Sequence, residues 1–209
     1  MFGSKSLIKR RIMFFKSKFG IMQFLALFMF VFTYKVSAHC DSMVGPVVKA
    51  SQKALETANI NYVLIWVQAK DEQEIRTLFE KVMSVRKLNN EAKELADVYF
   101  FETVVRIHRM GEGEPYTGLK PAGYHPEAGI EEADNAIEQK SVKNILTHLD
   151  QKYHAKVNEL FGVLQSKSYY NVDDVKAGRE YVEAYVHFIH FIEELYSGNI
   201  NQDKKHHNH

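Results

Sequence analysis

The sequence predicts an all-α fold, a helical bundle made of two pseudo-symmetric three-helix repeats. Apolar residues recur at helical spacing through most of the chain after residue 45, as at Ile75, Leu78 and Val82. Three of the four prolines, the residues that break helices, fall together between positions 115 and 126. An internal repeat then predicts that the helices come in two matching sets.

A gapless shift of 82 residues relates the two halves of the chain. In the 55 positions from Ala54 to His108, 12 residues are identical to those 82 positions later. The matches include Ala54 with Ala136, Leu78-Phe79 with Leu160-Phe161, and Ile107-His108 with Ile189-His190. Self-similarity at a fixed spacing indicates a duplicated structural unit.

Each half is predicted to hold one short and two long helices. In the first half we expect helices at about 46–57, 60–87 and 90–110. In the second half we expect them at about 130–139, 141–166 and 172–196. Pro46 suits the first turn of its helix. The four long helices would close one bundle core, with a pseudo-twofold axis between repeat halves 46–110 and 128–192.

Residues 1–38 have the pattern of a signal peptide. Basic residues precede an apolar run at 21–32, and Val36-Ser37-Ala38 places small residues where signal peptidase cleaves. The run is shorter than the roughly 20 residues that a membrane span requires. We therefore expect a periplasmic or secreted domain, 39–209, without a stable membrane span after processing. Its His-rich end, about 200–209, is expected to be disordered.

The composition of the expected mature chain limits its partners. It carries 20 basic and 26 acidic side chains, a net charge of −6 with histidine neutral. That balance disfavours nucleic acid as a partner, because nucleic-acid binding requires a basic surface. Cys40 is the only cysteine, so no internal disulfide can form. Its thiol would be buried, paired with another chain in an oligomer, or bound to metal.

Several residues are candidate ligands of a transition metal ion. Cleavage after Ala38 gives His39 a free amine beside its imidazole, and Cys40 adds a thiolate. His108 and His190 superpose under the repeat, and Glu183, His187 and His190 share one helical face. Amine, imidazole and thiolate donors suit nickel, copper or zinc. In the alternative interpretation these histidines are ordinary core residues or members of a solvated face.

Two resemblances add to these observations. The opening His39-Cys40-Asp41-Ser42-Met43-Val44-Gly45 resembles the mature start of nickel superoxide dismutase. On that resemblance His39 would supply amine and imidazole, Cys40 amide and thiolate, and the chemistry would be superoxide disproportionation. The second cysteine of that family falls at Val44, and its tyrosine falls at Val47.

The second resemblance covers nearly the whole mature chain. The stretches His39–Val48, Asn61–Val67, Glu94–Gly123 and Ala177–Phe191 are similar to a family of exported bacterial proteins of unknown function. This likeness implies export and a helical domain, and it transfers no activity.

Two functional hypotheses follow, and the sequence leaves open whether the protein is an enzyme. One is an exported metal-binding bundle, redox-active in the manner of superoxide dismutase at an N-terminal His-Cys site. The alternative is a non-catalytic periplasmic binding or structural module. In that case the long central loop, 111–128, would offer a partner surface around Tyr116 and Leu119.

Overall fold

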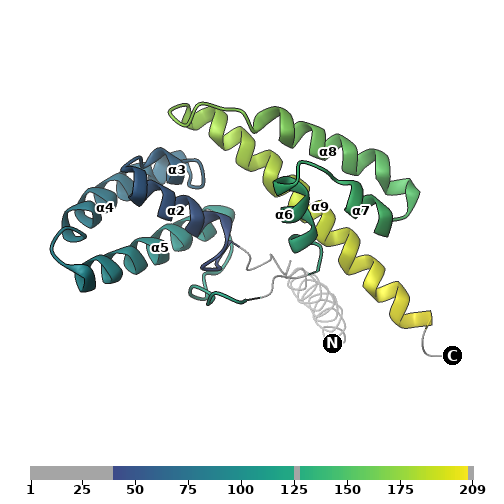
Figure 1. Ribbon diagram of the computed structural model, residues 1–209, viewed down its shortest axis with the longest axis horizontal. Helices are drawn as coiled ribbons and strands as arrows, with labels where there is room; N and C mark the ends of the chain where they lie inside the picture. Colours follow the sequence, from purple (N-terminus) through teal and green to yellow (C-terminus); the bar gives the residue numbers. More distant parts are fainter. Residues whose placement is uncertain (1–39, 125–127, 207–209) are drawn as a thin grey trace, which may run out of the picture. The chain divides into compact units, whose positions relative to one another are not determined.

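A computed structural model of the chain describes residues 40–124 and 128–206, with side chains described as far as residue 198 (Figure 1). The predicted signal peptide and His39 lie outside this range. The described residues form helices and no strand, which confirms the all-α prediction. Within them, none of the helices has the length and apolar character needed to cross a membrane.

The first half contains five helical segments in place of the three expected. They are α2 (Pro46–Thr57), α3 (Asn61–Leu64), the 3-10 turn η1 (Ala69–Asp71), α4 (Glu72–Val85) and α5 (Asn90–Glu112). The side chain of Asn89 caps α5 by accepting a hydrogen bond of 2.7 Å from the amide of Ala92. Gly113 then ends α5 with a φ of 78°, a conformation that favours glycine.

The second half follows the same order of segments. They are α6 (Ile130–Glu138), α7 (Lys143–His148), η2 (Gln151–Tyr153), α8 (His154–Lys167) and α9 (Val175–His206). Moving η1 and α4 forward by 82 residues gives the bounds of η2 and α8. The three-dimensional superposition of the two halves stays a prediction.

The expected continuous helices at 60–87 and 141–166 are wrong. The first breaks after Leu64, and Gln68 is extended with a ψ of 153°. The second breaks at Leu149, whose ψ is 149°. The break at 65–68 has a packing cause, because five consecutive side chains, 63–67, are all buried. Successive residues of a helix point in different directions, so one helix face could not bury all five.

The C-terminal helix also differs from the prediction. It begins at Val175 and continues to His206, beyond the predicted end at about 196, and the disordered tail stays a prediction. Asp174 caps its start by accepting a hydrogen bond of 3.0 Å from the amide of Ala177. No proline follows to interrupt the helix.

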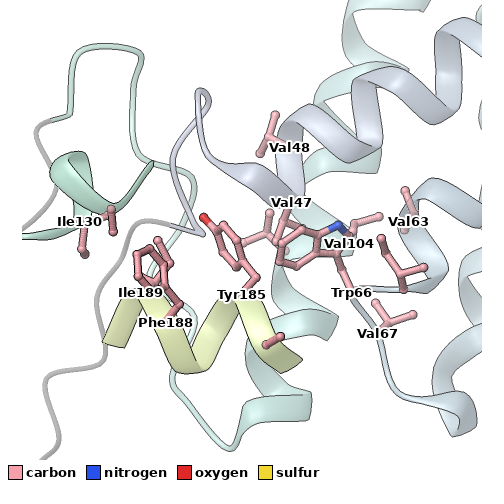
Figure 2. Packing of buried hydrophobic residues seen from close by; sticks show 14 of the residues in the cluster. Val47, Val48, Val63, Trp66, Val67, Val104, Ile130, Tyr185, Phe188 and Ile189 are labelled. Atoms are coloured by element: carbon pink, nitrogen blue, oxygen red, sulfur yellow. The ribbon is translucent and has the colours of Figure 1, made fainter. Parts of the chain in front are cut away.

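Aromatic side chains from both halves meet in the core. Trp66 lies edge-on to Tyr185 of α9, with ring centroids 5.7 Å apart (Figure 2). Val47 and Val104 belong to the same buried cluster, as does Phe188, which is fully buried (Figure 2). Buried aromatic rings contribute large apolar areas and prefer such edge-to-face geometry. The segment at 65–67 therefore joins the core of the first half to α9.

Arg179 of α9 fixes the turn that follows Leu64. Its guanidinium donates to the carbonyl oxygens of Leu64 and Val67, each at 3.1 Å. It also donates to the Glu72 carboxylate at 2.7 Å. These bonds satisfy carbonyl groups that lost their helical partners where the helix broke.

Gly178 of α9 permits a close approach to this turn. A Cβ atom at position 178 would lie 2.3 Å from Cγ2 of Ile65. We predict that Gly178→Ala lowers the free energy of unfolding by about 1–3 kcal/mol through overpacking. Ile65→Ala removes the clashing methyl group, so Gly178→Ala should cost far less in that background, as chemical denaturation of the double-mutant cycle would show.

The matched control is Gly162→Ala in α8, where a Cβ atom would meet no neighbour within 4 Å. This change should stabilise the protein by up to about 1 kcal/mol through helix propensity alone. Equal effects of Gly178→Ala in both Ile65 backgrounds would contradict the packing account.

A second prediction concerns Arg179 and acid stability. The hydrogen bond from Arg179, followed by the contribution of Arg76, holds the pKa of Glu72 below its usual value. A lowered carboxyl pKa gives stability that is present above the ordinary pKa and is lost as the pH falls through the folded-state value. Arg179→Met should therefore reduce the free energy of unfolding at pH 7 by roughly 2 kcal/mol and flatten its rise between pH 3 and 5.

Urea denaturation across this pH range measures both effects. Arg76→Met is the control, because Arg76 pairs with the same carboxylate at 3.4 Å but is more exposed and bonds no carbonyl group. If the two variants lost equal stability, the carbonyl bonds of Arg179 would have no special role.

Candidate functional site

The first described residues of the chain are held in the fold by the central loop. The amide of Lys120 donates to the Asp41 carbonyl at 2.8 Å, and the amide of Met43 donates to the Lys120 carbonyl at 3.0 Å. Ser42 and Lys120 thereby form an isolated parallel bridge. Asp41 and Ser42 are each only 1% exposed. The first described residues, 40–43, thus form a hydrogen-bonded segment that is buried at Asp41 and Ser42 and partly buried at Cys40 and Met43.

The loop at 113–124 is anchored in its turn to α5. The Tyr116 hydroxyl donates to the Glu102 carboxylate, and Tyr116 and Leu119 pack against the core. Burial, followed by this bond to Glu102, raises the pKa of Tyr116. The expected partner surface around Tyr116 and Leu119 is therefore not an exposed patch, and this loop instead covers residues 40–43.

A buried arginine stands at the centre of the site. Arg109 of α5 is 4% exposed, and its guanidinium lies 3.5 Å from Asp41, 3.5 Å from Glu112 and 4.0 Å from Glu114. Asp41 Oδ1 and Arg109 Nε attract each other by charge but lack hydrogen-bond geometry. Burial raises the pKa of Asp41, and the charge of Arg109 opposes that rise. One cation and three carboxylates are thus gathered around residues 40–43.

His108 presents one free ring nitrogen to this cluster. It is 4% exposed, and its Nδ1 lies 2.8 Å from the Trp66 carbonyl oxygen. A carbonyl only accepts, so Nδ1 carries the hydrogen and a neutral ring keeps its lone pair on Nε2. Nε2 has no hydrogen-bond partner and lies 3.5 Å from Glu112 Oε1. Histidines that bind metals usually make this kind of Nδ1 hydrogen bond to a carbonyl or carboxylate group.

Glu112 is the group that connects the predicted ligands, and the sequence prediction missed it. Burial raises the pKa of the Cys40 thiol, and the charge of Glu112 raises it further. The same charge contributes to the raised pKa of His190. Glu112 follows His108 by four residues, the spacing that places two side chains on one helix face. This spacing is the sequence feature from which Glu112 could have been predicted as a neighbour of His108.

The candidate metal ligands on α9 differ from one another in their burial and in their contacts. His190 is partly buried, and its Nδ1 lies 2.9 Å from the buried carboxylate of Glu193. This hydrogen bond is the main cause of its raised pKa. His187 and Glu183 are exposed on α9. His39 lies outside the described residues.

The described donors do not form a complete metal site by themselves. Across residues 40–124 and 128–198, no group of three or more His, Cys, Asp or Glu side chains is gathered closely enough to hold an ion. Beside the start of the described chain, His108 Nε2 and Glu112 Oε1 lie 3.5 Å apart, and the charge of Glu112 raises the pKa of Cys40.

The buried charges predict a strong effect of Arg109 on stability. Arg109→Met would leave the Asp41 carboxylate buried without a cation, which should cost about 3–5 kcal/mol in the free energy of unfolding. Adding Asp41→Asn should recover a large part of that loss. Thermal and urea denaturation measure both variants.

Lys156→Met is the control, since Lys156 forms an exposed pair with Glu159 and should change stability by less than about 1 kcal/mol. If Arg109→Met lowered the free energy of unfolding by no more than this control, Arg109 would not hold residues 40–43 in place.

Comparison with known proteins gives one finding. Neither a curated protein nor a solved structure matches the chain. A family model does match, over residues 44–191, which is most of the chain. The match includes α5 and α9 and begins just after the Cys40–Met43 segment. The chain belongs to the family of unknown function DUF6448.

Proposed function

We propose that this protein binds one transition metal ion at the start of its mature chain, beside the C-terminal end of α5. The observation that carries the proposal is the buried His108 imidazole, whose Nδ1 is held by a backbone carbonyl and whose Nε2 makes no hydrogen bond. A buried nitrogen without a partner costs free energy, and a metal ion would satisfy it.

The distance between the two adjacent donors supports a shared ion. Zinc binds nitrogen and oxygen at about 2.0–2.2 Å, so two ligands of one tetrahedral ion lie about 3.3–3.5 Å apart. The separation of His108 Nε2 and Glu112 Oε1 is 3.5 Å. Both side chains can therefore bind one ion without moving the helix that carries them.

Cys40 and His39 are the proposed remaining ligands. A thiol bound to metal gives up its proton, so the ion would offset the raised pKa of Cys40. When all are ionised, Asp41, Glu112 and Glu114 outnumber Arg109 by two charges, which suits a divalent cation. An imidazole with a thiolate favours nickel, copper or zinc. His190, which pairs with Glu193 of its own helix, is not assigned to the ion in this account.

Redox activity is a further step of the same proposal. Nickel or copper bound by a thiolate can change oxidation state, and the His-Cys-Asp opening implies superoxide disproportionation by resemblance. The alternative is a non-catalytic module in which the same buried charges only fix residues 40–43. The Nε2 atom of His108 favours the metal proposal, because it is buried without a hydrogen bond and lies 3.5 Å from Glu112 Oε1, so that one ion could bind both atoms.

The experiment uses protein exported and processed in a host cell, with its N-terminus sequenced to verify His39. We expect one nickel, copper or zinc ion per chain by elemental analysis, and a melting temperature that rises when that metal is added. Cys40→Ser, His108→Ala and Glu112→Gln should each lower the metal content at least several-fold.

His148→Ala is the matched control, because His148 is an exposed histidine whose ring bonds the Asn144 carbonyl. It should leave metal content unchanged. If the purified chain carries no stoichiometric metal, and its melting temperature does not change when nickel, copper or zinc is added, the non-catalytic module is supported instead. A dismutation assay on the loaded protein then decides whether the site is redox-active.

A further inference from the structure

The hairpin formed by α4 and α5 carries a concentrated apolar surface. Nine large apolar residues are exposed in the described part of the chain, and five of them lie between positions 85 and 99. They are Val85, Leu88, Leu95, Val98 and Tyr99. Leu88 and Leu95 are each 74% exposed, and Tyr99 is 61% exposed. Large apolar side chains exposed close together on a protein often mark an interaction site.

The same surface is hollowed between its two helices. A groove of about 760 Å³ runs between α4 and α5. Its apolar lining includes Leu78, Val82 and Ala96, and Val85, Leu95 and Tyr99 border it. The face therefore holds protruding apolar side chains and an apolar hollow next to each other.

The internal repeat gives a reason for the open groove. At a shift of 82 residues, Thr103 corresponds to Tyr185 and Arg106 to Phe188. In the second half both aromatic rings are buried, and Phe188 packs against Phe161 of α8. In the first half Thr103 and Arg106 line the groove. Thr103 is smaller than Tyr185, and Arg106 is charged where Phe188 is apolar, so these two side chains do not fill the space between α4 and α5.

We propose that a second copy of this chain occupies the groove, so that two α4–α5 hairpins pack about a twofold axis. In such a dimer, the ridge formed by Leu95 and Tyr99 of each copy enters the groove of the other. A twofold interface requires a surface complementary to itself, and a ridge beside a hollow meets that requirement. The product is a four-helix interface of a common kind.

The charges and the shape of this face favour a second copy over other occupants. Between residues 72 and 99 the chain carries six acidic and five basic side chains, so two copies would not repel each other strongly. This balance offers no basic excess for an anionic membrane. A small ligand in the groove would leave Leu88 and Leu95 in water, whereas a second hairpin is long enough to cover them.

The test is the mass of the chain in solution as a function of concentration. By sedimentation equilibrium on the processed protein we expect a reversible monomer–dimer equilibrium. Leu95→Glu and Tyr99→Glu should each raise the dimer dissociation constant roughly 30-fold or more, as for a central interface residue. Both side chains are exposed in the monomer, so circular dichroism and melting of the monomer should stay unchanged.

Tyr169→Glu is the matched control, because Tyr169 is 82% exposed and lies outside the α4–α5 hairpin. It should leave the dissociation constant unchanged. The proposal is overturned if the wild-type chain stays monomeric at millimolar concentration, or if a dimer persists equally in Leu95→Glu and Tyr99→Glu. Binding of a monomeric wild type to anionic vesicles, lost in both variants, would assign the face to a membrane surface.

Discussion

The rest of the site depends on the ion pairs that the buried guanidinium of Arg109 makes. Arg109 is only 4% exposed, and a buried charge is tolerated only when opposite charges lie near it. Three segments of the chain supply these charges, through Asp41, Glu112 and Glu114. Asp41 brings the Cys40 segment, Glu112 belongs to the last turn of α5, and Glu114 starts the central loop. Removing the cation would therefore loosen three segments together.

A series of contacts connects this cluster to helix α9. Arg179 bonds the carbonyl oxygens of Leu64 and Val67, which fixes the turn that carries Trp66. The Trp66 carbonyl in turn determines which nitrogen of His108 bears the hydrogen. The chemistry available at His108 thus follows from a break in a helix that the second half of the molecule holds in place.

The sequence predicted the helical class because helical periodicity is a local property. The predicted bounds match those of α2, which begins at Pro46, and nearly match those of α5, along which apolar residues recur at helical spacing. The break after Leu64 could not be predicted, since a buried turn keeps the apolar pattern of a helix and depends on Arg179, over a hundred residues away. Caps and helix breakers can be seen in a sequence, whereas long-range hydrogen bonds cannot.

The candidate site was predictable only in part, for a similar reason. Spacing placed Glu183 and His187 on one helix face with His190, but spacing alone does not show which face meets the core, and both are exposed. Glu112 was missed because its importance comes from Arg109 and the Cys40 segment rather than from a motif. The backbone of Asp41 and Met43 is held by Lys120, which lies about 80 positions away in sequence.

X-ray absorption spectroscopy at the metal edge of the processed protein, loaded with one equivalent of zinc, tests the central claim most directly. The account predicts one sulfur ligand at about 2.3 Å together with nitrogen and oxygen ligands at about 2.0–2.2 Å. The sulfur contribution should vanish in Cys40→Ser. A first shell without sulfur in the wild-type protein, or one that Cys40→Ser leaves unchanged, would contradict a metal site at the start of the mature chain.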